Sequence, residues 1–555
     1  MTDTTDPVLE IRNLSIALPA KADRRFAVEN VSLTLNRKEI LCIVGESGSG
    51  KSVMSSAIMN AVPPGLTITS GEVLFKGENV LEFNAEQLRD MRGARIAMIY
   101  QEPMAALNPA MKVGHQVDEV FQFHRPDITP AGRRAETLKL FDEMHLPSPA
   151  RIYDSYPHQI SGGQCQRVVI AMALACKPDI LIADEPTTAL DVTTQRQILS
   201  LIEELKGIYD NGTIFITHDF GVVADVADRV AVMCWGRLVE EGPAEQILMH
   251  PREDYTRLLV DAMPTLETTR TPDATRNDQP IVEVSGLHKV YDTGDREVHA
   301  LKDASFVLRR GETLAVVGES GSGKSTLAKA LIRLTEPTEG SVIIHERDFL
   351  QLAGKDLQAA RWEIQMIFQD PFGSLNPSHR VGWIIARGPV LMGLSKDEAK
   401  KRAEDLLELV GLPKQAYHRF PRNFSGGQRQ RIGIARALSM EPDVVIADES
   451  VSALDLSVQK QVLRLMNDLQ RRLDNAIIFI THDLRVAAQI SDYITVMERG
   501  EMVEFGTAED VFSAPKHPYT RKLLDAAPGK DWHPPRLTIE EADRIIAETA
   551  EAKAG

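Results

Sequence analysis

The sequence predicts an α/β fold in which one domain occurs twice in tandem. Its 555 residues exceed the roughly 250–300 that a single hydrophobic core usually supports. A ten-residue stretch that ends in Gly-Lys-Ser at residue 52 returns 273 residues later, and further matches follow it in the same order. Within each copy, short β-branched runs alternate with longer helix-like patterns, which is typical of a mainly parallel sheet covered by helices.

The strand predictions depend on short, almost wholly apolar runs. In the first copy these are residues 40–44, 180–183 and 213–217, and residues 444–447 repeat the second of them. Strands that are buried on both faces show such unbroken runs instead of an apolar/polar alternation. Helix-like patterns follow the glycine-rich segment that ends at residue 50 and the Ser-Gly-Gly-Gln segment that begins at residue 161.

The repeat sets the expected domain boundaries. We expect a first domain over residues 8–264, a linker over 265–280, a second domain over 281–528 and a tail over 529–555. The linker is polar, rich in Thr, Pro and Asp, and lacks hydrophobic periodicity. In the tail, Thr538 and Glu541 have the spacing of a capping box that opens an Ala/Glu-rich helix.

Composition and charge exclude several classes of protein. With 43% apolar and 26% charged residues, the chain is globular in composition, neither disordered nor collagen-like. Its net charge of −16 argues against a large generic contact with DNA or RNA, although a nucleotide can still be bound locally. The longest apolar run, residues 168–176, is far shorter than the roughly 20 residues that cross a bilayer.

The N-terminus and the cysteines add two further expectations. The first residues lack the basic and apolar regions of a signal peptide, so we expect the chain to stay in the cytosol. The four cysteines form no Cys-x-x-Cys pair, which favours neither a disulfide framework nor a thiolate metal site. They are expected to be buried or half-buried thiols.

A P-loop pattern, Gly-x4-Gly-Lys-Ser, occurs in both copies. Its glycines let backbone N–H groups curl around phosphate oxygens, its lysine places a cation on the β- and γ-phosphates, and its serine hydroxyl can bind Mg²⁺. The predicted phosphate-binding residues are Gly45, Glu46, Ser47, Gly48, Ser49, Gly50, Lys51 and Ser52, and Gly318, Glu319, Ser320, Gly321, Ser322, Gly323, Lys324, Ser325 and Thr326. The sequence therefore predicts two nucleotide sites.

Two acids end an apolar run in each copy, Asp184-Glu185 in the first and Asp448-Glu449 in the second. Successive side chains of a strand point in opposite directions, so the two acids cannot share one role. Beside a P-loop, the first acid supports Mg²⁺ and the second can orient or deprotonate the attacking water.

A Ser-Gly-Gly-Gln segment precedes a helix-like run in each copy. A serine and two glycines at a helix start expose backbone N–H groups at the positive end of the helix dipole, which suits an anion. An N-cap alone explains the serine but not the paired glycines. The residues are Ser161, Gly162, Gly163 and Gln164, and Ser425, Gly426, Gly427 and Gln428.

In each copy the P-loop, a glutamine loop, the Ser-Gly-Gly-Gln signature, the Asp-Glu pair and a later Thr-His-Asp stand in the order found in ABC-type ATPase domains. The sequence resembles two fused domains of this family over residues 8–264 and 281–528. The resemblance implies two P-loop NTPase domains, each with a mainly parallel sheet core and a helical subdomain. It also implies that the two copies pair head to tail, so that the signature of one closes over the ATP bound by the other.

The resemblance implies ATP and Mg²⁺ as cofactors and assigns residues to two sites. Site one has the first P-loop with Gln101, Asp184, Glu185 and His218, closed by Ser425 to Gln428. Site two has the second P-loop with Gln369, Asp448, Glu449 and His482, closed by Ser161 to Gln164. The metal ligands implied are Ser52, Gln101, Asp184, Ser325, Gln369 and Asp448. Asp191 and Asp455 match the Ala-Leu-Asp loops that cross the dimer interface, and Tyr291 matches the aromatic residue under adenine.

Three positions depart from the family pattern or differ between the copies. Leu18 stands at the position of Tyr291, which predicts weaker nucleotide binding at site one unless Phe26 substitutes for the missing aromatic ring. Cys165 replaces the residue seen as Arg429, and Lys38 replaces the glycine seen as Gly311. Neither of the last two changes removes a catalytic group, so both sites are expected to hydrolyse ATP.

The end of the second copy, His517-Pro518-Tyr519, is similar to a segment that follows the ATPase domain in dipeptide, oligopeptide and nickel importers. The first copy keeps Tyr255 but not the His-Pro pair. The resemblance therefore implies a fused double-ATPase subunit of a bacterial peptide importer, peripheral on the cytoplasmic face of the inner membrane. Its partners would be two membrane permease subunits and a periplasmic substrate-binding protein. A dipeptide, a longer peptide, glutathione, an opine and a nickel complex all stay open as cargo.

The alternative is a tandem ATPase that acts on ribosomes and does not transport. Such proteins are similar in their duplication but usually carry a long, charged helical linker. The linker here is short and mixed in charge, and the whole chain is acidic. DNA-repair relatives carry zinc-binding cysteine clusters, which this sequence lacks.

Overall fold

The computed structural model describes residues 7–554, except for 21, 23, 188–189, 273–278, 293–296, 371–372 and 453. Parts of three sequence predictions lie outside the described residues: the middle of the expected linker, Pro371 beside the second glutamine motif, and the alanines of the Ala-Leu-Asp loops, Ala189 and Ala453. The chain divides into two compact units. The first comprises Met1–Leu190, Thr194–Met263 and Asp531–Gly555, and the second comprises Asp191–Thr193 and Pro264–Lys530.

Two sheets form the first unit in its described part. An antiparallel sheet has the order β2-β1-β4-β5, and a second sheet has the order β10-β9-β3-β8-β7-β6, parallel except for the β9–β10 pair. The strands are β1 (Leu9–Ala17), β2 (Phe26–Leu35), β3 (Ile40–Val44), β4 (Thr67–Phe75), β5 (Glu78–Asn79), β6 (Ile96–Ile99), β7 (Ile180–Asp184), β8 (Gly212–Thr217), β9 (Arg229–Cys234) and β10 (Arg237–Pro243).

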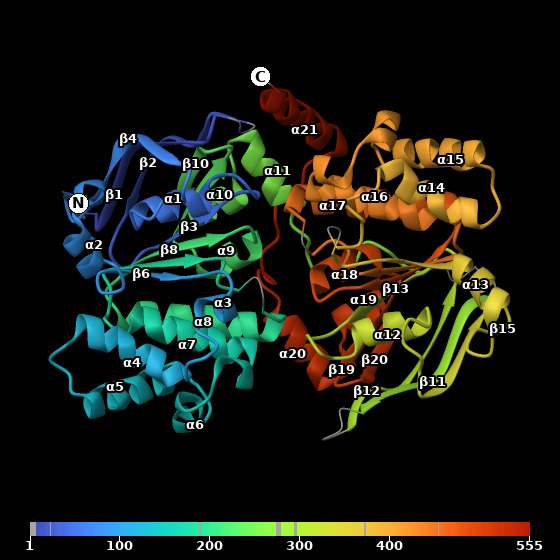
Figure 1. Ribbon diagram of the computed structural model, residues 1–555, viewed down its shortest axis with the longest axis horizontal. Coiled ribbons are helices and arrows are strands. Elements are labelled where there is room, and N and C mark those ends of the chain that lie inside the picture. Colours follow the sequence, from blue (N-terminus) through green and yellow to red (C-terminus); the bar gives the residue numbers. More distant parts are fainter. Residues whose placement is uncertain are drawn as a thin grey trace. The chain divides into compact units, whose positions relative to one another are not determined.

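Helices cover these sheets. They are α1 (Lys51–Ile58), α2 (Ala85–Met91), α3 (Pro103–Ala106), α4 (Val113–His124), α5 (Pro130–Glu143), α6 (Pro149–Tyr153), α7 (Gly162–Leu174), α8 (Val192–Ile208), α9 (Phe220–Val226), α10 (Ala244–Met249), α11 (Asp254–Ala262) and α21 (Ile539–Ala554). Figure 1 shows α4, α5, α6 and α7 gathered on one side of β6 and β8, away from β1, β2 and β4. This group is the helical subdomain that the family resemblance implied.

The second unit repeats this plan. Its described strands join in one sheet of order β15-β14-β11-β12-β20-β19-β13-β18-β17-β16. They are β11 (Pro280–Asp292), β12 (Glu297–Arg309), β13 (Thr313–Val317), β14 (Glu339–Ile344), β15 (Arg347–Asp348), β16 (Ile364–Ile367), β17 (Val444–Asp448), β18 (Ala476–Ile480), β19 (Tyr493–Glu498) and β20 (Glu501–Thr507). The helices are α12 (Lys324–Leu331), α13 (Gly354–Glu363), α14 (Val381–Leu391), α15 (Lys396–Leu409), α16 (Gly426–Leu438), α17 (Leu456–Leu473), α18 (Leu484–Ile490), α19 (Ala508–Ser513) and α20 (Pro518–Ala526).

In each unit an ion pair links an antiparallel strand to the strand that pairs antiparallel at the edge of the P-loop sheet. In the second unit Lys302 of β12 pairs with Glu501 of β20 at 3.0 Å. In the first unit Glu29 of β2 pairs with Arg237 of β10 at 2.8 Å. The positions correspond, but the charges are exchanged.

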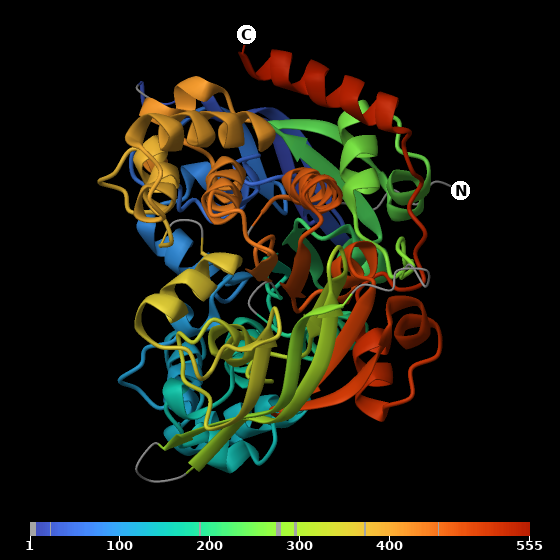
Figure 2. The same ribbon diagram turned by 90° about the vertical axis from the view of Figure 1, so that its right-hand side faces the viewer.

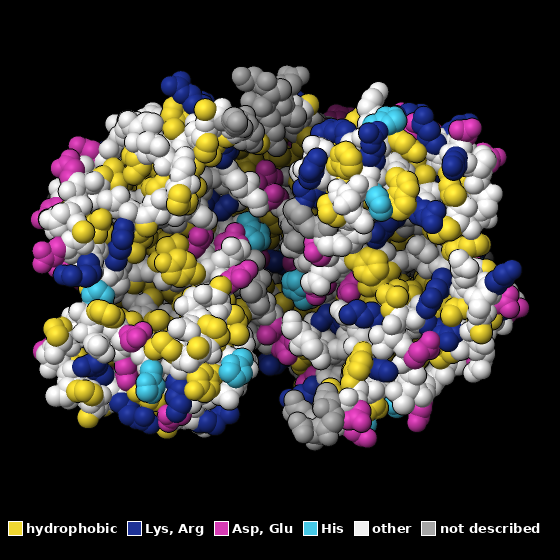
Figure 3. All heavy atoms as spheres, viewed as in Figure 1, with side chains coloured by type: hydrophobic (Ala, Val, Ile, Leu, Met, Phe, Trp, Pro, Cys, Tyr) yellow, Lys and Arg dark blue, Asp and Glu magenta, His cyan; other side chains and the backbone are white. Residues whose placement is uncertain are grey.

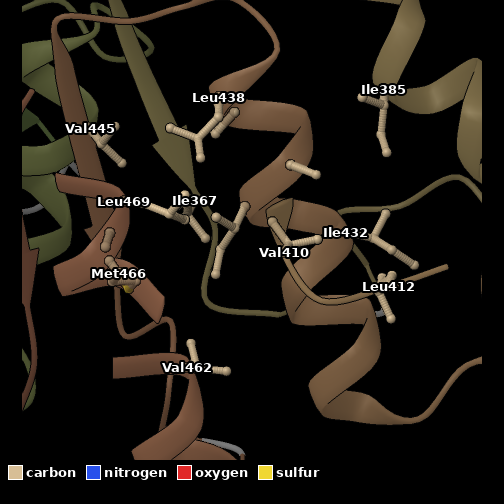
Figure 4. Packing of buried hydrophobic residues seen from close by; sticks show 14 of the residues in the cluster. Ile367, Ile385, Val410, Leu412, Ile432, Leu438, Val445, Val462, Met466 and Leu469 are labelled. Atoms are coloured by element: carbon tan, nitrogen blue, oxygen red, sulfur yellow. The ribbon is translucent and has the colours of Figure 1, made fainter. Parts of the chain in front are cut away.

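The core of the second unit shows why the apolar runs form buried strands. Figure 4 shows α16 between the side chains of Ile385 and Leu412 on one side and those of Val445 and Leu469 on the other. All four side chains are buried, and Ile385 is completely so. Burying such a side chain contributes about 1.5–3 kcal/mol to stability. One continuous core therefore fixes the signature helix α16 against the sheet.

The structure confirms the α/β fold class and the strand predictions at residues 40–44, 180–183, 213–217 and 444–447. It also confirms the capping box of the terminal helix. The Thr538 amide donates to the Glu541 carboxylate at 2.9 Å, and the Glu541 amide donates to the Thr538 hydroxyl at 3.3 Å. Within the described part of the chain, every helix is too short or too polar to span a bilayer.

Candidate nucleotide sites

The first P-loop connects β3 to α1 and has the backbone that its glycines allow. Gly45 and Gly50 have φ angles of 149° and 103°. A Cβ atom on Gly45 would lie 2.2 Å from the carbonyl oxygen of Met233, so only glycine fits there. The buried Lys51 ammonium donates to the carbonyl oxygens of Gly45 at 2.7 Å and Glu46 at 3.0 Å. The loop thus holds its cation in place at the start of a helix, as a phosphate site requires.

The second P-loop, between β13 and α12, repeats this geometry. The Lys324 ammonium donates to the carbonyl oxygens of Gly318 at 2.8 Å and Glu319 at 2.7 Å. Burial lowers the pKa of Lys324, while nearby acids, first Glu449, oppose that shift. A cavity of about 780 Å³ opens beside this loop. Its lining includes Ser320, Gly321, Gly323, Lys324, Ser325, Thr326, Gln369, Glu449 and Arg499. Its volume lies within the usual range for a small-molecule site.

The first acid of each pair faces the P-loop serine. The Ser52 hydroxyl donates to the Asp184 carboxylate at 3.2 Å, and the Ser325 hydroxyl donates to Asp448 at 3.4 Å. Burial is the main cause that raises the pKa of both aspartates, and the charge of the adjacent glutamate adds to it. A nearby cation would relieve this unfavourable burial of negative charge.

The second acid lies at the centre of a three-residue group in both units. The Gln101 amide donates to Glu185 at 2.9 Å, and His218 Nδ1 lies 3.1 Å from the other carboxylate oxygen. In the second unit, Gln369 donates to Glu449 at 2.6 Å, and His482 Nδ1 lies 3.4 Å from it. Strands β7 and β17 end at the aspartates, so each glutamate leaves the sheet.

Both glutamates have left-handed backbones, with φ angles of 47° at Glu185 and 44° at Glu449. Such a conformation costs of order 1–3 kcal/mol for a residue other than glycine and persists only where the surroundings impose it. The strain occurs at the same place in both copies. It is therefore a feature of the site and not an accident of one loop.

The glutamate raises the pKa of its histidine partner in both units, and in the second unit the histidine also lowers the pKa of the glutamate. The hydrogen bond from His482 lowers the pKa of Glu449, and the same bond raises the pKa of His482. For His218, burial lowers the pKa, but the hydrogen bond and charge of Glu185 outweigh it, so the pKa is raised. The geometry favours an imidazolium beside a carboxylate in each unit.

The donor set fits Mg²⁺. In each unit it consists of a serine hydroxyl, an aspartate carboxylate and the side-chain oxygen of the glutamine, and hard oxygen donors of this kind suit Mg²⁺. Among the described residues no group of three or more His, Cys, Asp and Glu side chains could hold a metal ion. A set this small suits an ion that keeps several waters and binds substrate phosphates.

The signature segments begin α7 and α16. Ser161 caps α7, since the Gln164 amide donates to its hydroxyl at 3.3 Å, and Ser425 caps α16 in the same way. A Cβ atom on the second glycine would lie 2.4 Å from Thr194 at Gly163 and 2.2 Å from Val458 at Gly427. A Cβ atom on the first glycine, Gly162 or Gly426, would meet open space.

Packing within the unit therefore explains the second glycine of each signature but not the first. An exposed glycine at a helix start leaves room for an anion to approach the N–H groups. The capping box explains both the serine and the glutamine. From the sequence, an N-cap explained only the serine.

The remaining predicted residues lie as follows. Asp191 accepts a hydrogen bond from the Thr193 hydroxyl at 2.9 Å, and Asp455 precedes α17 as its N-cap residue. Tyr291 is 37% exposed at the end of β11, with the Lys289 ammonium 5.0 Å from its ring.

The backbone register confirms that Leu18 is the counterpart of Tyr291. Tyr291 pairs with Val298, and the Leu18 amide donates to the corresponding residue, Arg25. The guanidinium of Arg25 lies over the ring of Phe26 at 4.9 Å and so covers one of its faces.

The other two departures leave the backbone intact. The Cys165 thiol lies 3.6 Å from the carbonyl oxygen of Pro157, and Arg429 donates to the equivalent oxygen of Pro421 at 2.9 Å. Burial raises the pKa of Cys165 to about 11, so this thiol stays neutral. Lys38 has a φ angle of 57°, the left-handed turn that glycine normally occupies.

Two side chains that contact the first P-loop, Tyr255 and Arg24, were not predicted as site residues from the sequence. The Glu46 amide donates to the Tyr255 hydroxyl at 3.4 Å, and the Glu319 amide donates to Tyr519 at 3.2 Å in the second unit. Arg24 donates to the carbonyl oxygen of Gly48 and lies 5.3 Å from the ring of Trp235. The recurrence of the tyrosine in both copies was the available signal, but it was interpreted only as a subfamily marker.

Comparison with known proteins agrees with these motifs. Residues 28–188 and 301–452 match the family described as ABC transporter, and residues 239–287 and 503–555 match the C-terminal region of oligopeptide/dipeptide transporters. The glutathione import ATP-binding protein GsiA of Salmonella paratyphi A is 45% identical, over 97% of this chain and 92% of that protein. GsiA of Pectobacterium atrosepticum is 46% identical, over 94% of this chain and 90% of that protein.

Among solved structures, cbiO1 of Clostridium perfringens, part of an ABC transporter complex, is 29% identical. The match covers 45% of this chain and 94% of the cbiO1 chain, with a TM-score of 0.39. The repeated P-loops, signatures and Gln–Glu–His groups, together with the family matches over both copies, lead to one conclusion: the chain belongs to the ABC transporter family, as an ATP-hydrolysing subunit of a bacterial importer.

Proposed function

We propose that each unit binds ATP and Mg²⁺ at its P-loop and that Glu185 and Glu449 activate the water that attacks the γ-phosphate. The observation that carries this proposal is the group of Gln, Glu and His side chains that recurs in both units. Each glutamate is oriented by two side chains and follows an aspartate that faces the P-loop serine. Such a carboxylate can hold a water and accept its proton.

At site one, the residues of this chain would have the following roles. Backbone N–H groups of the P-loop and the Lys51 ammonium bind the phosphates. Ser52, Asp184 and the Gln101 oxygen would hold Mg²⁺, which when bound offsets the charge of the phosphate oxygens. His218 holds Glu185 by a charge-assisted hydrogen bond and can sense the γ-phosphate beside it.

Site two would use the equivalent residues Lys324, Ser325, Asp448, Gln369 and His482. The cavity beside the second P-loop supports this assignment, because it is lined by that loop together with Gln369 and Glu449. Tyr291 lies on β11, which pairs with β12 beside the cavity, and it is exposed enough for a nucleobase to stack on it. The role of the two signatures in closing these sites stays a prediction.

We also propose that membrane permeases dock next to the glutamine loops. A cavity of about 520 Å³ in the first unit is lined by Tyr100, Met98, Ala106 and Val120 among others, and Tyr100 precedes Gln101. Tyr100 is 53% exposed and Met104 48%, which is unusual for large apolar side chains and typical of a protein contact. In the second unit, Phe368 is exposed just before Gln369.

The cargo that we propose is a small peptide, delivered by a periplasmic binding protein to two permease subunits. Identity to glutathione import proteins over nearly the whole chain and the oligopeptide/dipeptide C-terminal region support this class. They also favour import over an action on ribosomes. Figure 3 shows acidic and basic side chains interspersed on the visible face of both units, without the continuous basic area that RNA binding favours.

One experiment tests the function and its alternative together. The chain is co-expressed with candidate permeases, membranes are separated from ribosomes by sedimentation, and ATP hydrolysis is measured with and without the binding protein and peptides. We expect the chain in the membrane fraction and ATP hydrolysis stimulated by the loaded binding protein. Sedimentation with ribosomes and no dependence on permeases would contradict the proposal.

A further inference from the structure

The tyrosine that contacts each P-loop stands at the start of a short helix near the end of its copy. Tyr255 is the second residue of α11, and Tyr519 is the second residue of α20. Both side chains are buried, and burial raises the pKa of Tyr519 to about 12 and that of Tyr255 still higher. Each hydroxyl is therefore a neutral, fixed acceptor for a P-loop amide.

A glutamate of the sheet fixes the beginning of each of these helices. The Glu240 carboxylate accepts the amides of Arg252 at 2.9 Å and Glu253 at 3.2 Å. The Glu504 carboxylate accepts the amides of Lys516 at 2.7 Å and His517 at 3.0 Å. The position of the tyrosine thus depends on how firmly the helix behind it is held.

The end of α11 is held by the tail of the chain. Arg536 donates to the carbonyl oxygens of Asp261 and Met263, both at 2.8 Å, and the Leu537 amide donates to the Asp261 carboxylate at 3.2 Å. Asp261 is only 1% exposed.

The tail helix α21 then lies along α11. Leu258 of α11 is buried against Ala542 and Ile545 of α21, and Arg257 pairs with Glu541 at 3.7 Å. Figure 2 shows the red helix α21 beside the green segment that contains α11. The first unit is therefore completed by residues that follow the second copy in the sequence.

The reverse holds for the second unit. Leu266, just after α11 in the sequence, packs against the cluster that contains Tyr519 and Leu523 of α20. The Thr269 hydroxyl donates to Gln489 at 2.7 Å, and Arg270 donates to the carbonyl oxygen of Ile490 at 2.8 Å. The segment that follows the first copy thus contacts the cluster around Tyr519 and the end of α18, while the segment that follows the second copy contacts α11.

We propose that these two exchanged segments act as braces for the P-loops: residues 531–548 for site one and residues 264–272 for site two. The inference depends on the proposed function, in that it takes the P-loops as ATP sites. Each brace holds a helix, the helix holds a tyrosine, and the tyrosine hydroxyl holds the second residue of the P-loop. A change at the tail thereby alters ATP binding at site one alone.

The first unit has the greater need of its brace. In α20, the Tyr519 amide donates to the His517 side chain at 3.3 Å, and Pro518 begins the helix. In α11, Glu253 makes no such cap and Asp254 replaces the proline. The helix without a side-chain cap at its N-terminus, α11, is therefore the one held by the longer segment, residues 531–548.

The test measures ATP binding to one site at a time in the full chain. Lys324→Ala leaves site one to be titrated, and Lys51→Ala leaves site two. Ending the chain after Lys530, or the single change Ile545→Asp, should weaken ATP binding about two- to tenfold at site one and leave site two unchanged. This range corresponds to the loss of one hydrogen bond. Tyr255→Phe should reproduce the effect.

Leu266→Asp is the matched variant and should weaken site two alone, as should Tyr519→Phe. Arg544→Ala, on the exposed side of α21, is the control that should change neither site. Hydrogen exchange at residues 45–50 should rise in the Ile545→Asp variant, which reports on the P-loop even if folding of the truncated chain is impaired.

Equal ATP binding by the parent and the Ile545→Asp variant, or equal weakening at both sites, would overturn the inference. If Lys51→Ala left ATP binding at site one intact, the assignment of the P-loop would fail instead, so the two failures are distinguishable.

Discussion

At the residue scale, the two copies place the same side chains around the same carboxylate. Gln101 and His218 hold Glu185, while Gln369 and His482 hold Glu449. The left-handed backbone of each glutamate carries strain that local sequence preferences do not favour. The chemistry proposed for these sites therefore makes its clearest predictions here.

Replacing either glutamate by glutamine removes the base and keeps the shape. We expect Glu185→Gln and Glu449→Gln each to retain ATP and to lower turnover at their own site by roughly 10²–10⁴-fold, the usual contribution of a general base. Turnover and nucleotide retention are measured in the single and double variants. A double variant with normal ATP hydrolysis would show that these acids are not the base.

The pair of Glu449 and His482 also predicts how stability depends on pH. His482 has a pKa raised above its ordinary 6.5, so its share of stability is complete below that value and is lost as the pH rises through the raised pKa. Glu449 has a pKa lowered below 4.5, so its share is complete above that value and is lost as the pH falls through the lowered pKa. Glu449→Gln should lower the pKa of His482, measured by NMR, and Glu185→Gln should not. A His482 titration that stayed in place in Glu449→Gln would contradict the pairing.

The difference between Leu18 and Tyr291 predicts unequal sites. Restoring the ring with Leu18→Tyr should tighten ATP binding at site one by about 0.5–1.5 kcal/mol, and Tyr291→Leu should weaken site two by a similar amount. The measurement is ATP titration with the other site disabled at its P-loop lysine. Phe26, which lies under Arg25, and Trp235, which lies under Arg24 near the first P-loop, are the alternative sources of stacking. Equal affinities in both parent sites would favour these alternatives.

At the element scale, the signature helices separate packing from ligand binding. A Cβ atom on Gly427 would overlap Val458, whereas one on Gly426 would meet open space. Gly427→Val should therefore lower the free energy of unfolding of the second unit by about 1–3 kcal/mol, as overpacking does. Gly426→Ala should leave stability nearly unchanged.

A charged substitution at the first signature glycine tests the predicted role of the signature in ATP hydrolysis. If an anion approaches the start of α16, a bulkier and charged residue in Gly426→Asp should abolish turnover at an unchanged melting temperature. The matched variant Gly162→Asp does the same for α7. Full activity in both would show that neither helix start meets the nucleotide.

The helices and strands show how much of the structure could be predicted from the sequence. The apolar runs predicted β3, β7, β8 and β17 because a strand buried on both faces has an unmistakable composition. The motifs predicted which residues share each site because their order and spacing are specific. The contact between Tyr255 and Glu46 was not predictable, since more than 200 residues separate them and no local pattern records a tertiary hydrogen bond.

At the scale of the whole molecule, the exchanged braces were equally hidden from the sequence. Residues 265–280 have the composition of a linker, yet Leu266, Thr269 and Arg270 make specific contacts within the second unit. The tail carries a recognisable capping box, but nothing in its sequence indicates that α11 is its partner. Composition predicts whether a segment can pack, not where it packs.

The exchanged charges between the sheets have a consequence for the history of the duplicated gene. Glu29 faces Arg237 in one copy, and Lys302 faces Glu501 in the other. A crossover that brought one partner from each half would set two acids or two bases against each other. Both pairs are largely exposed, so such a mismatch would cost about 1 kcal/mol or less and would disfavour gene conversion at one position alone only mildly.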